Sequence, residues 1–141
     1  EVEAVSKILI PIDGSECSMK ALLKAKELGG FYKSELTVIT VIDSGRYVGI
    51  DFKQDLINAG IEAGQALLET AVESLKDYPY PVKTTYRMGD IANEIIAMAE
   101  ENKFDLIVIG SRGLGVFTRA LLGGVSHKVV THANTSVYVV K

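Results

Sequence analysis

Residues 104–115 read Phe-Asp-Leu-Ile-Val-Ile-Gly-Ser-Arg-Gly-Leu-Gly, so a short apolar run passes directly into a glycine-rich turn. A run that is apolar on both faces is typical of a parallel sheet, because helices cover both faces of such a sheet. Similar runs recur along the chain. The sequence therefore predicts strands at residues 7–13, 35–43, 82–88, 104–110 and 137–140.

Segments with helical periodicity separate these runs, and we predict helices at residues 15–28, 51–78, 90–102 and 125–132. Asp90 is placed to cap the third of these helices, and Gly29 and Gly30 to end the first. This alternation predicts a single α/β domain over residues 1–141, a doubly wound, five-stranded parallel sheet flanked by helices and Rossmann-like. With winding in both directions from the first strand, the strand order is 3-2-1-4-5. Ligands are then expected beyond the ends of the first and fourth strands.

Composition excludes several classes of function. The 141 residues are 48% hydrophobic and 23% charged, with a formal net charge of −3. Such a composition is typical of a folded globular domain. The negative net charge argues against nucleic acid as a partner. No stretch approaches the ~18 apolar residues of a membrane span, and residues 1–7 have no signal-peptide pattern. We therefore expect a cytoplasmic protein with no membrane contact, and the single cysteine, Cys17, excludes an internal disulfide.

The turn after the fourth predicted strand is the most informative part of the sequence for function. Gly110 and Gly113 begin a loop in which the backbone can approach a ligand closely and present its N–H groups. Gly123 and Gly124 precede the last predicted helix, whose N-terminus favours phosphate, and Ser126 adds a hydroxyl. Glycines also serve simply as turn formers. Their position at the predicted reversal of the sheet favours a phosphate-binding loop.

The end of the first predicted strand supplies a carboxylate. Asp13 suits a nucleoside, because a carboxylate accepts hydrogen bonds from ribose hydroxyls or an adenine amino group. The alternative is that Asp13 caps the following helix, a role that Ser15 fills equally well. Asp13 and Glu16 would repel a phosphate, so we place the phosphate at the glycine loop. Pro11 indicates a bulge or an unpaired position beside the site. Val41 and Ile42, at the end of the second predicted strand, offer an apolar wall for adenine.

Other features limit the chemistry. Arg112 has the charge to neutralise a phosphate, although an arginine in a solvated loop is common. The chain has no Gly-x-x-x-x-Gly-Lys-Ser/Thr motif and no identifiable pair of nucleophile and base, so ATP hydrolysis, if any, should be slow. Met88 and Gly89 stand at the end of the third predicted strand, where a response-regulator receiver would need an aspartate. That class of protein is therefore excluded.

These motifs resemble the universal stress protein family over nearly the whole chain. The resemblance rests on Ile-Pro-Ile-Asp-Gly-Ser at residues 10–15, Gly89, residues 105–113 and the closing Val-Tyr-Val-Val at residues 137–140. The nucleotide-binding branch of the family has Gly, two residues, Gly, nine residues, Gly and then Ser or Thr. This sequence has glycine at 110, 113 and 123 at that spacing, but Gly124 stands where Ser or Thr is usual. The departure removes one hydroxyl contact to phosphate.

The resemblance implies bound ATP or AMP, with Mg²⁺ held chiefly through phosphate oxygens when a triphosphate binds. Asp13 and Val41 would contact adenosine, and the glycine positions would surround the ribose and phosphates. No catalytic residue and no metal ligand is predicted. The predicted nucleotide-binding residues are Pro11, Asp13, Val41, Met88, Gly110, Arg112, Gly113, Gly123, Gly124, Val125 and Ser126.

The last predicted strand, residues 137–140, is a sheet edge with an apolar ladder that needs a cover. A second copy related by a twofold axis provides one, and the resemblance implies the same homodimer. We therefore predict a homodimeric, ATP-binding stress protein that acts as a sensor or regulator. Bound nucleotide is expected to alter the conformation of the loop between Asp43 and Asp51, or the partners that this loop binds. Two alternatives remain: a dimeric interaction module that binds no nucleotide, favoured by Gly124, and a slow ATP hydrolase.

Overall fold

The computed structural model describes residues 5–47, 49, 51–113 and 122–141. Strands and helices alternate along the chain, as predicted. In chain order they are β1 (Lys7–Pro11), α1 (Glu16–Tyr32), β2 (Glu35–Ile42), the short 3-10 helix η1 (Ser44–Tyr47), α2 (Lys53–Ser74), β3 (Val82–Met88), α3 (Ile91–Glu101), β4 (Leu106–Gly110), α4 (Gly124–His132) and β5 (Ser136–Val140).

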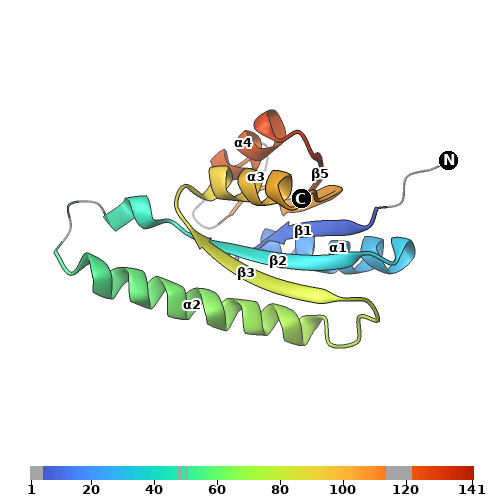
Figure 1. Cartoon of the computed structure of the whole chain (residues 1–141), viewed down its shortest axis with the longest axis horizontal. Helices are drawn as coiled ribbons and strands as arrows, with labels where there is room; N and C mark the ends of the chain where they lie inside the picture. The colour runs from blue at the N-terminus through green and yellow to red at the C-terminus, as the bar shows by residue number, and fades with distance from the viewer. Residues whose placement is uncertain (1–4, 48, 50, 114–121) are drawn as a thin grey trace.

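The five strands form one parallel sheet in the order β3-β2-β1-β4-β5, which confirms the predicted doubly wound α/β fold. Helices cover both faces, with α2 on one side and α3 and α4 on the other (Figure 1). Neighbouring residues of β1 serve different cores: Ile8 and Ile10 pack toward α1 and α2, and Leu9 toward α3 and α4. Burial from two sides explains why the inner strands β1, β2 and β4 are largely apolar, whereas the edge strand β3 is mostly polar.

Pro11 ends β1 at a position where its missing amide hydrogen costs no hydrogen bond to the neighbouring strand. The pairing of β1 with β2 extends to Pro11 and Ile39, whereas its pairing with β4 ends at Leu9 and Ile107. The next amide, that of Ile12, donates to the carbonyl of Ile39 at 2.9 Å. Pro11 is thus paired with β2 and lies beyond the register of β1 with β4.

The predicted end of the first helix is wrong. Helix α1 continues through Gly29 and Gly30 to Tyr32, and Lys33 in the left-handed conformation, with φ of 60°, forms the cap. Gly29 is inside the helix because a side chain has no room there. A Cβ would overlap the hydroxyl of Tyr78 and lie 2.9 Å from Leu36 Cδ2. The glycine marks a close contact and not a helix end.

Two capping predictions are confirmed. The side chain of Asp90 accepts a hydrogen bond from the amide of Asn93 at the start of α3. Ser15 caps α1 by accepting from the amide of Ser18. None of the helices in the described part of the chain is long and apolar enough to cross a membrane.

Candidate functional site

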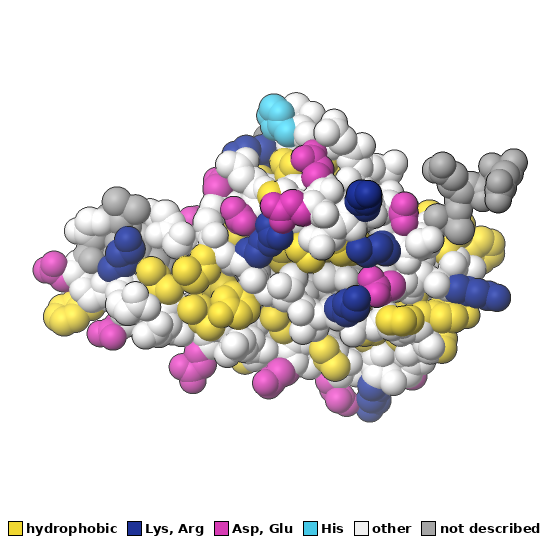
Figure 2. Space-filling model, viewed as in Figure 1, with side chains coloured by type: hydrophobic (Ala, Val, Ile, Leu, Met, Phe, Trp, Pro, Cys, Tyr) yellow, Lys and Arg dark blue, Asp and Glu magenta, His cyan; other side chains and the backbone are white. Residues whose placement is uncertain are grey.

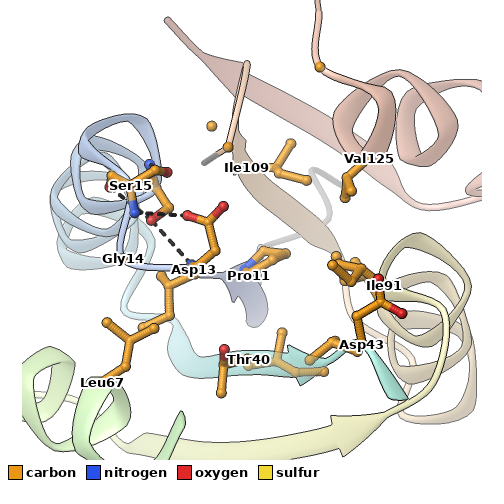
Figure 3. Close-up of a pocket in the computed structure, with 18 of the residues that line it drawn as sticks. Pro11, Asp13, Gly14, Ser15, Thr40, Asp43, Leu67, Ile91, Ile109 and Val125 are labelled. Atoms are coloured by element: carbon orange, nitrogen blue, oxygen red, sulfur yellow. Dashed lines mark hydrogen bonds between the residues drawn. The ribbon is translucent and has the colours of Figure 1, made fainter. Parts of the chain in front are cut away.

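A cavity of about 620 Å³ opens beyond the carboxyl ends of the strands, at the point where the sheet reverses its winding. Its volume lies within the ~300–1,000 Å³ that is usual for sites that bind small molecules. Figure 3 shows Asp13, Thr40, Asp43, Ile91, Ile109 and Val125 arranged around this space. The cavity therefore draws on both halves of the chain, and it lies where the strand order predicted a ligand.

Asp13 is held by the turn that joins β1 to α1. Its Oδ1 accepts from the amide of Ser15 at 2.9 Å, and its own amide donates to Ser18 Oγ at 3.3 Å. The Ser18 hydroxyl donates in turn to the carbonyl of Ser15 at 3.0 Å. Ser15 supplies the helix cap, and the carboxylate of Asp13 points toward the cavity in Figure 3.

Asp13 also reaches the glycine loop, which the sequence analysis treated as separate from it. A Cβ built at Gly113 would overlap Asp13 Oδ2, so the carboxylate lies directly against this glycine. The placement of phosphate at the glycine loop stays a prediction, and this carboxylate lies beside that loop. The turn after β1 and the loop after β4 converge, because their strands are neighbours in the sheet.

Close packing of α1 against the end of β4 requires a glycine at position 110. A Cβ at this position would lie 2.8 Å from the carbonyl carbon of Cys17 and 2.9 Å from its oxygen and Cβ. The first turn of α1 thus rests on the end of β4 with no space for a side chain. Gly110 lines the cavity, but its identity is already explained by this helix contact.

The N-terminus of α4 is tied to the end of β4 through Ser111. The Ser111 carbonyl accepts from the amide of Gly123 and from the Ser126 hydroxyl, both at 2.7 Å. Gly123 is the N-cap and provides no side-chain hydrogen bond, so the amides of the first turn, including that of Val125, have no partner within the helix. Such amides attract an anion. The Ser126 hydroxyl lies within hydrogen-bond distance of the carbonyls of Ser111 and Gly123, and its contact with phosphate stays a prediction.

Helix α4 is also fixed to α3. Lys128 Nζ lies 3.1 Å from Asp90 Oδ2, and the amide of Asn93 donates to the same oxygen at 3.0 Å. The Asn93 amide, followed by the Lys128 ammonium, lowers the pKa of Asp90. The stabilisation from this shift is present above the unfolded-state pKa and is lost as pH falls through the lower folded-state value. The contact sets α4 beside Ile91, which lines the cavity.

The remaining walls are apolar and come largely from helices. Gly60 and Gly64 let α2 approach β2 closely, since a Cβ would lie 3.1 Å from Ile42 Cγ2 at the first position and 3.2 Å from Thr40 Cγ2 at the second. The part of the lining that α2 forms was not predicted, although two glycines four residues apart in an apolar helix indicate close packing on a neighbouring element. The lining residues that were not predicted are Ile12, Gly14, Ser15, Ser18, Ile39, Thr40, Asp43, Gly60, Ala63, Gly64, Leu67, Ile91, Ile95 and Ile109.

The structure brings together every residue of the predicted set except Met88. The cavity is lined by Pro11, Asp13, Val41, Gly110, Arg112, Gly113, Gly123, Gly124, Val125 and Ser126. Met88 lies outside this lining, at the end of edge strand β3, with 44% of its surface exposed. Within the described part of the chain, no three His, Cys, Asp or Glu side chains gather to hold a metal ion.

Comparison with known proteins gives consistent matches. The model of the universal stress protein family matches residues 4–141. Universal stress protein MJ0531 of Methanocaldococcus jannaschii is 35% identical over 138 residues, which is 96% of this chain and 81% of that protein. The solved structure of protein MJ0577 from the same organism is 31% identical to this chain and has a TM-score of 0.91. The match covers 99% of this chain and 97% of that protein.

A third comparison concerns a ligand. A solved universal stress protein in complex with cAMP is 25% identical to this chain, with a TM-score of 0.75 and 99% of each chain covered. That neighbour binds an adenine nucleotide.

Proposed function

Because this chain belongs to the universal stress protein family, we propose that it binds an adenine nucleotide and acts as a nucleotide-dependent sensor or regulator. The observation that carries the proposal is the convergence of Asp13, Val41 and the motif glycines on one cavity at the reversal of the sheet. The cAMP complex of a structural neighbour adds support for this class of ligand. ATP and AMP are the nucleotides that the sequence predicts.

The lining suits the parts of a nucleotide. Val41 and the close-packed α2 give an apolar slot for the flat base. The carboxylate of Asp13 is oriented to accept hydrogen bonds from ribose hydroxyls. Amides at Gly113 and at the N-terminus of α4 can donate to phosphate oxygens, and each hydrogen bond to a charged group contributes about 1.5–3 kcal/mol. A few such bonds are enough for micromolar binding.

Magnesium would reach this site with a polyphosphate and not as a resident ion. Mg²⁺ prefers carboxylates together with phosphate oxygens, and it keeps several waters. Of the described residues near the glycine loop, Asp13 supplies a carboxylate, but one of its oxygens already accepts from the Ser15 amide. The donor set fits an ion held mainly by the ligand.

The test is a calorimetric titration of the full chain after bound small molecules have been removed. ATP, AMP and GTP are each added with and without Mg²⁺. We expect micromolar binding of adenine nucleotides and weaker binding of GTP. If no nucleotide gives heat or raises the unfolding temperature, the chain is an interaction module of the same fold and the proposal is wrong.

We further propose that two copies of the chain pair through β5. This strand stands at one edge of the sheet, and Tyr138 within it is 40% exposed. An edge strand presents backbone N–H and C=O groups that a second chain can pair. A twofold axis beside β5 would join the two sheets and cover this edge.

Tyr138→Lys is expected to shift the protein toward a monomer, because pairing across the axis would bring the two introduced charges close together. Light scattering measures the mass. Tyr86→Lys is the matched control, since Tyr86 is 39% exposed on β3 at the opposite edge. We expect the control to remain a dimer. A dimer in both variants would place the interface elsewhere, and a monomeric unmodified protein would refute dimerisation.

A further inference from the structure

The edge strand β3 presents a continuous row of backbone groups on its outer side. It pairs with β2 in unbroken register, from Val82 opposite Leu36 to Met88 opposite Ile42, so no bulge interrupts it. It stands last in the order of the described strands, and Figure 1 shows it facing the viewer between α2 and α3. Natural edge strands are usually short, bulged or covered, because free N–H and C=O groups pair readily with another strand. The outer side of β3 is therefore suited to strand addition.

Both cations of β3 are engaged by neighbouring carboxylates. Lys83 Nζ lies 3.1 Å from Glu35 Oε1, and Arg87 contacts Glu94 and Glu101. A charged lysine is one of the features by which natural proteins prevent pairing at a sheet edge. Because these two charges are compensated, they do not prevent pairing here.

An apolar patch borders this edge on the side of α2. Tyr86 and Met88 are in register with Thr40 and Ile42, the residues against which the glycines of α2 pack, so all four face that helix. Tyr86 and Met88 are nevertheless exposed. Figure 2 shows apolar side chains gathered beside the first half of α2 and the neighbouring end of β3. A strand added to β3 would cover this patch.

The outer flank of α2 beside the patch is acidic. Residues 54–75 contain no lysine or arginine. With about 3.6 residues per turn, Leu67 turns toward the cavity, whereas Glu62 and Glu69 lie on the other flank, on the side of β3. Both carboxylates are exposed, and in the part of the chain that the structure describes neither forms an ion pair. Their charges favour a cationic partner.

This charge also decides against a second copy of the chain at the same edge. Two copies paired through β3 about a twofold axis would set Glu62 and Glu69 of one copy opposite those of the other, and like charges across paired strands are destabilising. A segment of another protein that carries lysine or arginine meets no such repulsion. The stems of these side chains lie well on apolar surface while their charged ends reach carboxylates.

We propose that β3 and the adjoining flank of α2 bind an extended, basic segment of a partner protein, which adds to the sheet as a further strand. Its apolar side chains cover Tyr86 and Met88, and its basic side chains pair with Glu62 and Glu69. None of these four residues lines the cavity, so the inference goes beyond the proposed function and does not depend on nucleotide.

The test titrates the isotopically labelled full chain with the synthetic peptide Lys-Thr-Val-Thr-Val-Thr-Lys, in which lysine and valine share one face of a strand. We expect NMR shift changes concentrated at the amides of residues 82–88 and a dissociation constant below about 1 mM. The peptide Glu-Thr-Val-Thr-Val-Thr-Glu should bind at least about fivefold more weakly, because its carboxylates would face those of α2. Lys-Thr-Pro-Pro-Val-Thr-Lys should not bind, since it lacks a backbone donor on each side of the strand.

Variants of the chain test each contact. Tyr86→Lys is expected to weaken binding of the lysine peptide at least about tenfold, because it removes apolar surface and adds a like charge. Glu62→Gln combined with Glu69→Gln should weaken it severalfold. Glu73→Gln is the matched control, since this carboxylate lies on the same helix but already pairs with Lys76. Tyr138→Lys, at the opposite edge of the sheet, should also leave peptide binding unchanged.

Each contrary result has a distinct meaning. Unchanged amides at residues 82–88 with about 2 mM lysine peptide would overturn the inference, and shifts confined to β5 would place strand addition at the other edge. Equal binding of the lysine and glutamate peptides would refute the part of α2. A mass above that of a dimer, lowered by Tyr86→Lys in light scattering, would show that second copies occupy this edge. None of these results alters the nucleotide titration, so the two proposals fail independently.

Discussion

Gly110→Ala is expected to destabilise the fold by about 1–3 kcal/mol, the usual cost of adding a methyl group to a well-packed interior. The new Cβ would lie 2.8 Å from the carbonyl carbon of Cys17. Because the obstacle is backbone in the first turn of α1, no rotation of a flexible side chain can relieve the clash. The helix would have to move away from the end of β4.

The measurement is the urea midpoint of unfolding, compared with that of Gly30→Ala. Gly30 lies in the last turn of α1, and a Cβ there meets nothing within 4 Å. Replacing a helical glycine by alanine in free space stabilises a protein by about 0.5–1 kcal/mol. Replacing glycine by alanine should therefore raise stability at Gly30 in α1 and lower it at Gly110, on which α1 packs. An unchanged midpoint for Gly110→Ala would show that α1 is not packed against β4 as described.

The sheet could be predicted from the sequence because its signal is local. Most strands are apolar on both faces, and the helices between them have their own periodicity, so the order of elements and the topology follow from a few general rules. The end of α1 could not be predicted in the same way. Gly29 resembles a helix terminator, and its true role depends on Tyr78 and Leu36, which only the folded chain brings beside it.

The candidate site was predictable to the extent that it lies at strand ends. Asp13 could be found because it ends a predicted strand, Val41 because it lies near the end of another, and Gly113 because of its loop. The wall from α2 was missed because sequence periodicity gives the apolar face of a helix but not the strand that it covers. The contact of Asp13 with Gly113 joins opposite halves of the chain. No local pattern predicts such a contact.

Gly113→Glu is expected to weaken adenine-nucleotide binding at least about tenfold, equal to ~1.4 kcal/mol, while the chain remains folded. The Cβ would displace the carboxylate of Asp13, and the new carboxylate would enter the loop that we assign to phosphate. Gly113 lies beyond the end of β4 in a half-buried segment outside regular secondary structure, so the sheet and its helices do not depend on it.

The control for charge is Gly30→Glu, which adds the same side chain at an exposed position near the far end of α1, where a Cβ has open space. It should leave the affinity unchanged. Gly113→Ala separates the two causes, since it displaces Asp13 without adding charge and should give a smaller loss. Calorimetry measures each affinity, and circular dichroism checks each fold. Undiminished binding by folded Gly113→Glu would mean that the phosphate does not lie at this loop, because two carboxylates cannot share that space with an anion at no cost.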